Sequence, residues 1–99
     1  MTSFGLSSVS DVKLNGQNYR EWETSIRVLL MGPELDHHLD DDPPEETDDA
    51  KKALRKKWNT NDRKVMSVIC QNVEVPIRMD IARLLTTKEM WSHLQRRYI

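Results

Sequence analysis

Apolar side chains recur at helical spacing between the few glycines and prolines of this chain. The first run has aromatic and aliphatic residues at i, i+3, i+7, i+10 and i+11, which places them on one face of a helix. Its members are Tyr19, Trp22, Ile26, Leu29 and Leu30. Asn18 is the candidate N-cap, Glu21 stands at capping-box spacing from it, and Gly32 followed by Pro33 is a typical stop. We therefore predict a first helix over residues 19–31.

A second apolar stripe begins at residue 50 and has basic residues on its other faces. Its members are Ala50, Leu54, Trp58, Val65 and Ile69. Thr47 is the candidate N-cap, and Asp48 and Asp49 place negative charge in the first turn, where the helix dipole favours it. We predict a helix over residues 48–71. Its weakest helix formers are residues 58–61, so a kink or break is expected there if the helix is interrupted at all.

Two shorter helices are predicted near the end of the chain. Pro76 suits the first position of a helix, because its missing N–H costs nothing there. The apolar stripe that follows contains Ile77, Ile81, Leu84 and Leu85. Thr86 and Glu89 have the spacing of a capping box, which predicts the start of the last helix. The inner face of that helix contains Met90, Trp91, Leu94 and Tyr98.

These four helices predict an all-α fold. No alternating run of β-branched residues is flanked by hairpin turns, apart from a weak stretch at residues 10–14. Ninety-nine residues suffice for one hydrophobic core and not for two. We expect a single domain over residues 1–99, a small bundle of four main helices with residues 1–17 as an N-terminal arm.

An acidic connector separates the first two helices. Residues 34–49 hold nine carboxylates and neither lysine nor arginine, and Pro43 and Pro44 lie within this stretch. We expect one short turn over residues 35–39. Residues 40–47 have too little apolar area to offset the entropy of ordering, so we expect a solvated acidic loop there.

Charge and composition exclude several classes of protein. Fifteen Lys and Arg against sixteen Asp and Glu leave a net charge of −1, so no overall field draws the chain to nucleic acid or lipid. Cys70 is the only cysteine, which leaves no internal disulfide and no Cys-based zinc site. No run approaches the roughly 18 apolar residues that span a bilayer, and residues 1–10 lack the features of a signal peptide. We expect no membrane association and a cytoplasmic location, with the nucleus as a second compartment.

No arrangement of residues predicts catalysis. A serine elbow, a phosphate-binding glycine loop and carboxylates held at a fixed separation are all missing from the pattern. His37 and His38, beside Asp36 and residues 40–42, form the one metal-like cluster. Adjacent histidines point to different sides of a helix or strand, and two prolines interrupt the spacing of a calcium loop, so a solvated loop is favoured. We expect no enzyme activity, no metal, no cofactor and no small-molecule substrate.

A basic stripe on the second predicted helix is the candidate contact for a nucleic acid or an acidic partner. Its main members are Lys51, Lys52, Arg55, Lys56 and Lys57, and Arg63 and Lys64 extend it. The acidic residues just upstream can neutralise this stripe, and no aromatic residues interleave it at stacking positions. Binding of nucleic acid is therefore the weaker interpretation.

The three tryptophans each fall within the apolar stripe of a different predicted helix. They are Trp22, Trp58 and Trp91. Because each indole removes a large area from water, we expect the three to share one core and to supply much of its stability.

The order of these residues resembles the N-terminal part of the Gag polyprotein of copia-type LTR retrotransposons of plants. The specific pieces are the Leu-Asn-Gly-x-Asn-Tyr-x-x-Trp start over residues 14–22 and the Trp-x-x-Leu-x-x-x-Tyr end over residues 91–98, with Trp58 and Asp62 between them. The resemblance implies a helical capsid-type domain that self-associates around element RNA without chemistry of its own. It also implies that five aromatic residues form the core. These are Tyr19, Trp22, Trp58, Trp91 and Tyr98.

The resemblance also suggests how the chain associates. Family members continue past the position of Ile99 into further helices and usually a zinc knuckle, so apolar side chains that those helices cover need another cover here. We expect a homodimer through the last helix, either by burial of matching patches around a two-fold axis or by exchange of a terminal helix, with residues 19–31 as a further candidate surface. The contact residues expected on the last helix are Met90, Leu94, Tyr98 and Ile99.

The expected function is that of a structural module. Its expected partners are further copies of itself and full-length Gag, with which it would co-assemble or interfere. Two alternatives stay open: a protein-binding adaptor that a host has adopted for regulation or defence, and a weak RNA-binding domain without sequence preference.

Overall fold

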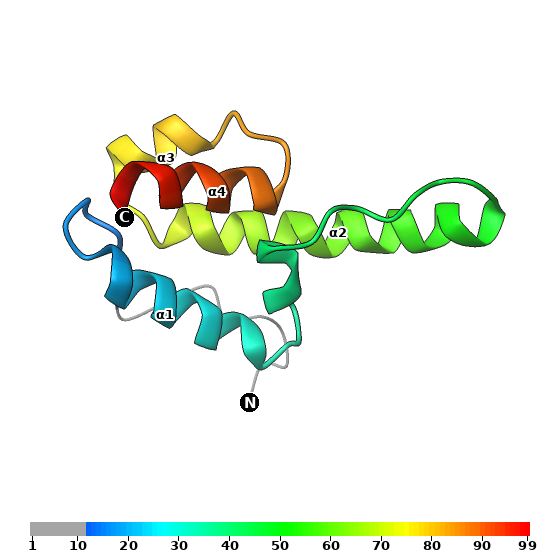
Figure 1. Cartoon of the computed structure of the whole chain (residues 1–99), viewed down its shortest axis with the longest axis horizontal. Coiled ribbons are helices and arrows are strands. Elements are labelled where there is room, and N and C mark those ends of the chain that lie inside the picture. Colours follow the sequence, from blue (N-terminus) through cyan, green and yellow to red (C-terminus); the bar gives the residue numbers. More distant parts are fainter. Residues whose placement is uncertain (1–11) are drawn as a thin grey trace.

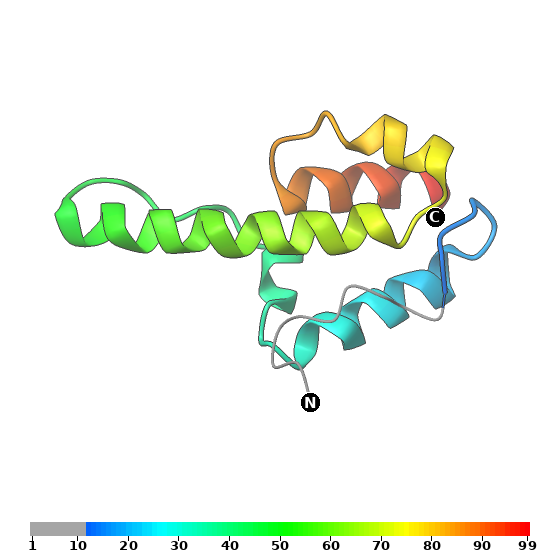
Figure 2. The same cartoon turned by 180° about the vertical axis from the view of Figure 1, so that it is seen from behind.

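The computed structural model describes residues 12–99, which fold into four α-helices and one short 3₁₀ helix. These elements are α1 (Tyr19–Met31), η1 (Asp36–Leu39), α2 (Asp49–Gln71), α3 (Val75–Ile81) and α4 (Thr87–Tyr98). α3 and α4 lie on one side of the long helix α2, and α1 lies on the other (Figure 1). The view from behind shows the same arrangement (Figure 2). The predicted all-α class is confirmed. Residues 1–11 of the expected N-terminal arm lie outside the described residues.

Helix α1 has the bounds that its apolar pattern predicts, but Asn18 does not cap it through its side chain. The Asn18 carboxamide oxygen accepts the N–H of Asn15 at 3.0 Å, and its nitrogen donates to the Lys13 carbonyl at 2.8 Å. Gly16 lies in the same turn with a φ of 95°. The side chain therefore closes the turn that leads into the helix, which leaves it unable to cap.

The segment before α1 is tied to the end of α2. The backbone N–H of Leu14 donates to the Asn72 carbonyl, and the N–H of Glu74 donates to the Leu14 carbonyl, each at 3.0 Å. The Trp22 indole N–H donates to the same Asn72 carbonyl at 2.6 Å. These bonds fix α1 against the junction of α2 and α3.

Helix α2 is continuous and is not interrupted at residues 58–61, its weakest helix formers. The polar side chains that weaken this stretch bond within the helix: the Thr60 hydroxyl donates to the Lys56 carbonyl at 3.1 Å, and Asn59 accepts from Arg55 at 3.2 Å. The predicted cap is wrong by one residue. Asp48, and not Thr47, accepts the N–H of Lys51, at 2.9 Å.

The first turns of α2 project beyond the rest of the molecule (Figure 1). We call residues 49–57 the α2 extension; all of them are exposed except Arg55, which is half-buried. The predicted apolar stripe is buried at Val65 and Ile69 but exposed at Ala50 and Leu54. Periodicity identifies the apolar face of a helix, but it does not show which turns of that face another element covers.

The short helix α3 buries Ile77 and Ile81. It ends at Ile81, so Leu85 falls in the connection to α4, where its side chain is 80% exposed. The expected burial of Leu85 is therefore wrong.

Helix α4 begins with the cap that its sequence predicts. The Thr86 hydroxyl oxygen accepts the N–H of Glu89 at 3.1 Å. The Glu89 carboxylate in turn accepts the N–H of Leu85 at 2.9 Å, which secures the connection from α3. Within residues 12–99, no helix has the length and apolar content that crossing a bilayer requires.

Candidate functional site

The aromatic residues divide into two groups. Trp22 and Trp91 are buried with ring centroids 5.3 Å apart, and the buried Tyr19 lies 6.2 Å from Trp22. Trp58 stands outside this cluster and is half-buried, with its ring 4.7 Å from that of His38. The expectation of one core shared by all three tryptophans is therefore wrong for Trp58, because α2 carries it to the point where the extension leaves the body.

Tyr98 is the remaining aromatic residue that we expected in the core. It is half-buried and packs against the core from outside. The Arg97 guanidinium lies 5.7 Å from the centroid of its ring. Tyr19 differs, because its buried hydroxyl has no hydrogen-bond partner among residues 12–99. Burial, aided by the nearby charge of Glu23, raises the pKa of Tyr19 to about 12.

A buried polar junction connects η1, α2 and α4. His38 is 1% exposed, and its Nδ1 lies 2.9 Å from an Asp62 carboxylate oxygen. The second Asp62 oxygen accepts the N–H of Thr87 at 3.1 Å, and the Thr87 hydroxyl donates to the Asp62 carbonyl at 3.1 Å. Asp62 is thus a structural residue that holds two other elements to α2.

Our sequence interpretation missed this role of His38. It placed the histidine in the acidic segment before a solvated loop, where nothing in the local pattern marks it as buried. The pairing with Asp62 spans 24 residues, and the only available signal was Asp62 among the residues that carry the family resemblance. Among residues 12–99, no three His, Cys, Asp or Glu side chains gather as a metal site would require.

Two of the four expected self-association residues are part of the core. Met90 is 2% exposed and Leu94 is fully buried. They pack inward because the inner face of α4 meets α2 and η1. The structure therefore excludes Met90 and Leu94 as contact residues of the folded domain. Tyr98 is half-buried and Ile99 is exposed, so only these two reach the surface.

The basic stripe lies mainly on the α2 extension. Its lysines are exposed; they are Lys51, Lys52, Lys56 and Lys57. Arg55 instead holds the acidic connector against the helix, because its Nη1 donates to the Pro44 carbonyl at 3.2 Å. Four cations of the predicted five are thus available to a partner.

The acidic connector is also held at its start. Asp40 pairs with Arg27 of α1 at 3.4 Å, and Asp42 pairs with Lys88 of α4 at 2.9 Å. The same Arg27 guanidinium lies 5.5 Å from the centroid of the Trp91 ring. Such exposed pairs contribute little stability individually, but here they direct the connector past the second half of α1 and the start of α4.

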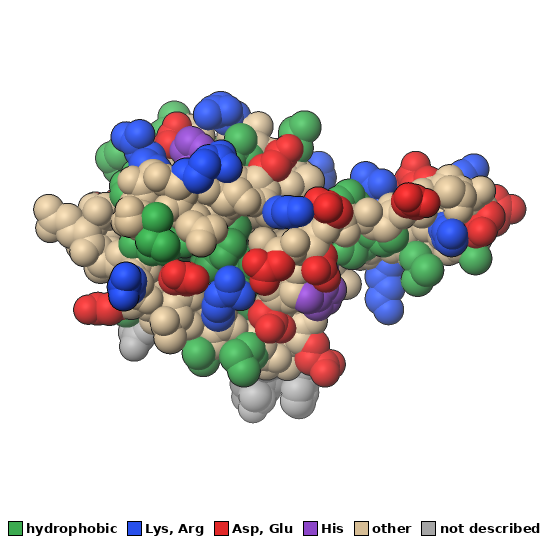
Figure 3. All heavy atoms as spheres, viewed as in Figure 1, with side chains coloured by type: hydrophobic (Ala, Val, Ile, Leu, Met, Phe, Trp, Pro, Cys, Tyr) green, Lys and Arg blue, Asp and Glu red, His purple; other side chains and the backbone are tan. Residues whose placement is uncertain are grey.

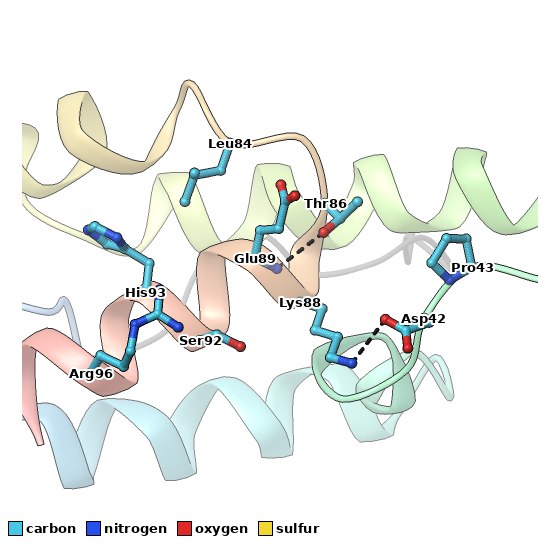
Figure 4. Close-up of a pocket in the computed structure, with 9 residues that line it drawn as sticks. All are labelled: Asp42, Pro43, Leu84, Thr86, Lys88, Glu89, Ser92, His93 and Arg96. Carbon is cyan, nitrogen blue, oxygen red and sulfur yellow. Dashed lines mark hydrogen bonds and ion pairs between the residues drawn. The ribbon is translucent and has the colours of Figure 1, made fainter.

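A first hollow of about 640 Å³ lies between the connector and α4 (Figure 4). Asp42 and Pro43 stand at one end of it, and His93 and Arg96 stand at the other. A second hollow of about 380 Å³ adjoins it, because Pro43 and two residues at the start of α4 line both. Its further lining residues include Arg55, Trp58, Arg63 and Leu85. We call the two hollows together the groove.

One side of the groove is fixed by a contact between α3 and α4. His93 Nε2 lies 2.6 Å from an Asp80 carboxylate oxygen. This hydrogen bond, assisted by the positive charges of His93, Arg97 and Arg83, holds the pKa of Asp80 below its ordinary value.

Comparison with protein families finds one match. A family described as gag-polypeptide of LTR copia-type matches residues 26–99, which include η1, α2, α3, α4 and the end of α1. Comparison with curated proteins and with solved structures finds no match. The copia-type resemblance is thereby confirmed, whereas the plant origin stays a prediction.

Proposed function

Because this chain belongs to the gag polypeptides of LTR copia-type elements, we propose that it is a capsid-like structural domain that associates with further copies of itself and performs no catalysis. The family match over residues 26–99 is the observation that carries this proposal. The geometry supports a structural role. Trp22 and Trp91 pack against each other in the core, and Asp62 forms hydrogen bonds that hold η1 and α4 to α2.

The surface supports association with other protein surfaces. Val28 and Met31 are exposed one turn apart on α1, and Val75 and Met79 are exposed one turn apart on α3. Pairs of large apolar side chains at this spacing form short stripes on the outside of a helix. Such stripes are typical of contact sites between proteins when they gather into a patch.

The proposed partners are further copies of this chain and full-length Gag. A domain that offers the same contact surfaces as full-length Gag competes for them by mass action. The proposal is therefore that the chain either enters a Gag assembly or limits its growth.

Sedimentation velocity and light scattering over a range of concentrations test self-association. We expect the weight-average mass to rise with concentration, together with retention of a similar full-length Gag on an immobilised domain. A monomer at every concentration, combined with no retained Gag, would contradict the proposal.

A second candidate function rests on the exposed lysines of the α2 extension. They could neutralise phosphates of RNA, whose binding would then weaken steeply with added salt. Reversal of charge at Lys51, Lys52, Lys56 and Lys57 should abolish binding to a single-stranded RNA probe without reducing self-association. RNA binding that is insensitive to both salt and this variant would exclude the candidate.

A further inference from the structure

The free end of the α2 extension, together with the connector residues that lead into it, carries a group of carboxylates (Figure 3). We call Glu45, Glu46, Asp48 and Asp49 the acidic tip; all four are exposed. Asp48 caps α2, whereas none of the four forms an ion pair with a described residue. The tip therefore presents at least three carboxylates to a partner.

The groove at the base of the extension has the complementary charge. Arg63 and Arg96 line it, both are exposed, and neither pairs with a carboxylate of the described residues. Trp58 and Leu85 add apolar surface to the hollow that Arg63 lines. The groove thus combines unpaired positive charge with apolar walls.

The carboxylates that already line the groove are engaged. Asp42 pairs with Lys88, Glu89 accepts the N–H of Leu85, and Asp62 is buried in the junction with η1 and α4. The pair of Asp42 with Lys88 also shows that a carboxylate of the connector fits against this part of α4. A further carboxylate entering the groove would therefore find Arg63 and Arg96 unpaired, with the exposed Glu89 as the opposing negative charge.

The acidic tip cannot reach the groove of its own molecule. Asp49 and Trp58 are nine residues apart on a continuous helix, which separates them by about 13 Å along the axis. The hydrogen bond from Arg55 to the Pro44 carbonyl also holds the connector along this helix. A tip that occupies a groove must consequently come from another molecule.

We propose that the groove of one copy binds the acidic tip of a second copy, so that the α2 extension is the element through which copies of this chain recognise each other. This inference rests on the proposed function, since it assigns the surfaces for the self-association proposed there. The tip and the groove take the place of the contact surface that we expected on the inner face of α4, because that face is buried in the core. Electrostatic complementarity of this kind selects the partner and sets its orientation.

Charge reversal tests the assignment. The tip variant is Glu45→Lys with Glu46→Lys, and the groove variant is Arg63→Glu with Arg96→Glu. Each variant alone should raise the dissociation constant of self-association by about tenfold or more, since close charge pairs at an interface carry energies of that size. The matched control is Lys13→Glu with Arg20→Glu, two exposed cations outside the groove. It should leave the constant within about threefold.

A mixture of the tip variant and the groove variant provides the decisive measurement. In a mixed pair, lysines of one tip meet glutamates of one groove, and the unchanged tip meets the unchanged groove. Sedimentation equilibrium of the mixture should therefore recover the affinity of the unaltered chain. The altered residues are exposed, and circular dichroism verifies that each variant keeps its helical content.

The outcomes separate this inference from the proposed function. An unaltered chain that stays monomeric overturns the tip-to-groove contact, and it overturns the proposed function as well if no full-length Gag is retained. Self-association that survives both variants, or that weakens in each and is not recovered in the mixture, overturns the tip-to-groove contact and leaves association through another surface.

Discussion

At Asp62, one buried carboxylate holds two separate elements to α2. It accepts from His38 of η1 and from the first N–H of α4, where the helix dipole also favours a negative charge. The burial of this group is possible because its hydrogen bonds are made within the protein.

Removal of this carboxylate should be costly. Asp62→Ala leaves the His38 ring and the Thr87 N–H without their partner inside the protein, so we expect a loss of about 2–4 kcal/mol in the free energy of unfolding. Urea denaturation measures it. Asp49→Ala, an exposed aspartate on the same helix, is the control and should cost no more than about 0.5 kcal/mol. A loss below about 1 kcal/mol for Asp62→Ala would contradict the role of the junction.

The lowered pKa of Asp80 predicts that the free energy of unfolding depends on pH. Its pKa is lower in the folded chain than its ordinary value of 3.8, chiefly because of the hydrogen bond to His93. The stabilisation is therefore complete above that value and is lost as the pH falls through the lower folded pKa. An NMR titration of the Asp80 carboxyl should give a midpoint below 3.8. In His93→Ala the midpoint should rise; an unchanged midpoint would show that the hydrogen bond is not the cause.

At the scale of elements, the local signals in the sequence were sufficient for some boundaries and insufficient for others. Thr86 caps α4 as its spacing predicts, because a capping box depends only on residues within one turn. At the start of α2, Thr47 and Asp48 are both good caps, and sequence alone does not decide between them. The burial of Leu54 and Trp58 depends on which other elements lie alongside, which no local pattern contains.

The two threonines make a matched test of capping. Thr86→Ala should lower the free energy of unfolding by about 1 kcal/mol, because the Glu89 N–H loses its acceptor. Thr47→Ala should change it by less than about 0.5 kcal/mol, because Asp48 is the cap. Thermal or urea denaturation of both variants measures these changes in the free energy of unfolding. Equal losses would indicate that the cap of α2 is shared.

The two halves of α2 should respond differently to the same kind of truncation. Ile69 is fully buried, so Ile69→Ala should cost about 2–5 kcal/mol in the free energy of unfolding. Leu54 is 59% exposed on the extension, so Leu54→Ala should cost less than about 1 kcal/mol. Urea denaturation of the pair tests the fold directly. A similar cost at both positions would mean that the extension is covered in solution.

At the scale of the whole molecule, the chain is broad and flat, with principal extents of 44, 37 and 19 Å. Its radius of gyration of 14.0 Å exceeds the value of about 13 Å for a typical domain of 100 residues. The α2 extension contributes to this shape. The groove could not be predicted from the sequence, because it brings Asp42, Arg63 and Arg96 together from separate segments.

Because of the α2 extension, the two ends of one continuous helix should open by different routes, the first by local fraying and the second by unfolding of the whole domain. Its first turns open without disturbing the core, so their backbone amides should exchange with deuterated solvent through fraying alone. The amides near Ile69 should exchange only when the whole domain unfolds, because both they and the surrounding side chains are enclosed. Binding of a second molecule to the extension would slow exchange at the first turns and leave the amides near Ile69 unchanged. Deuterium uptake along this helix would then report assembly residue by residue.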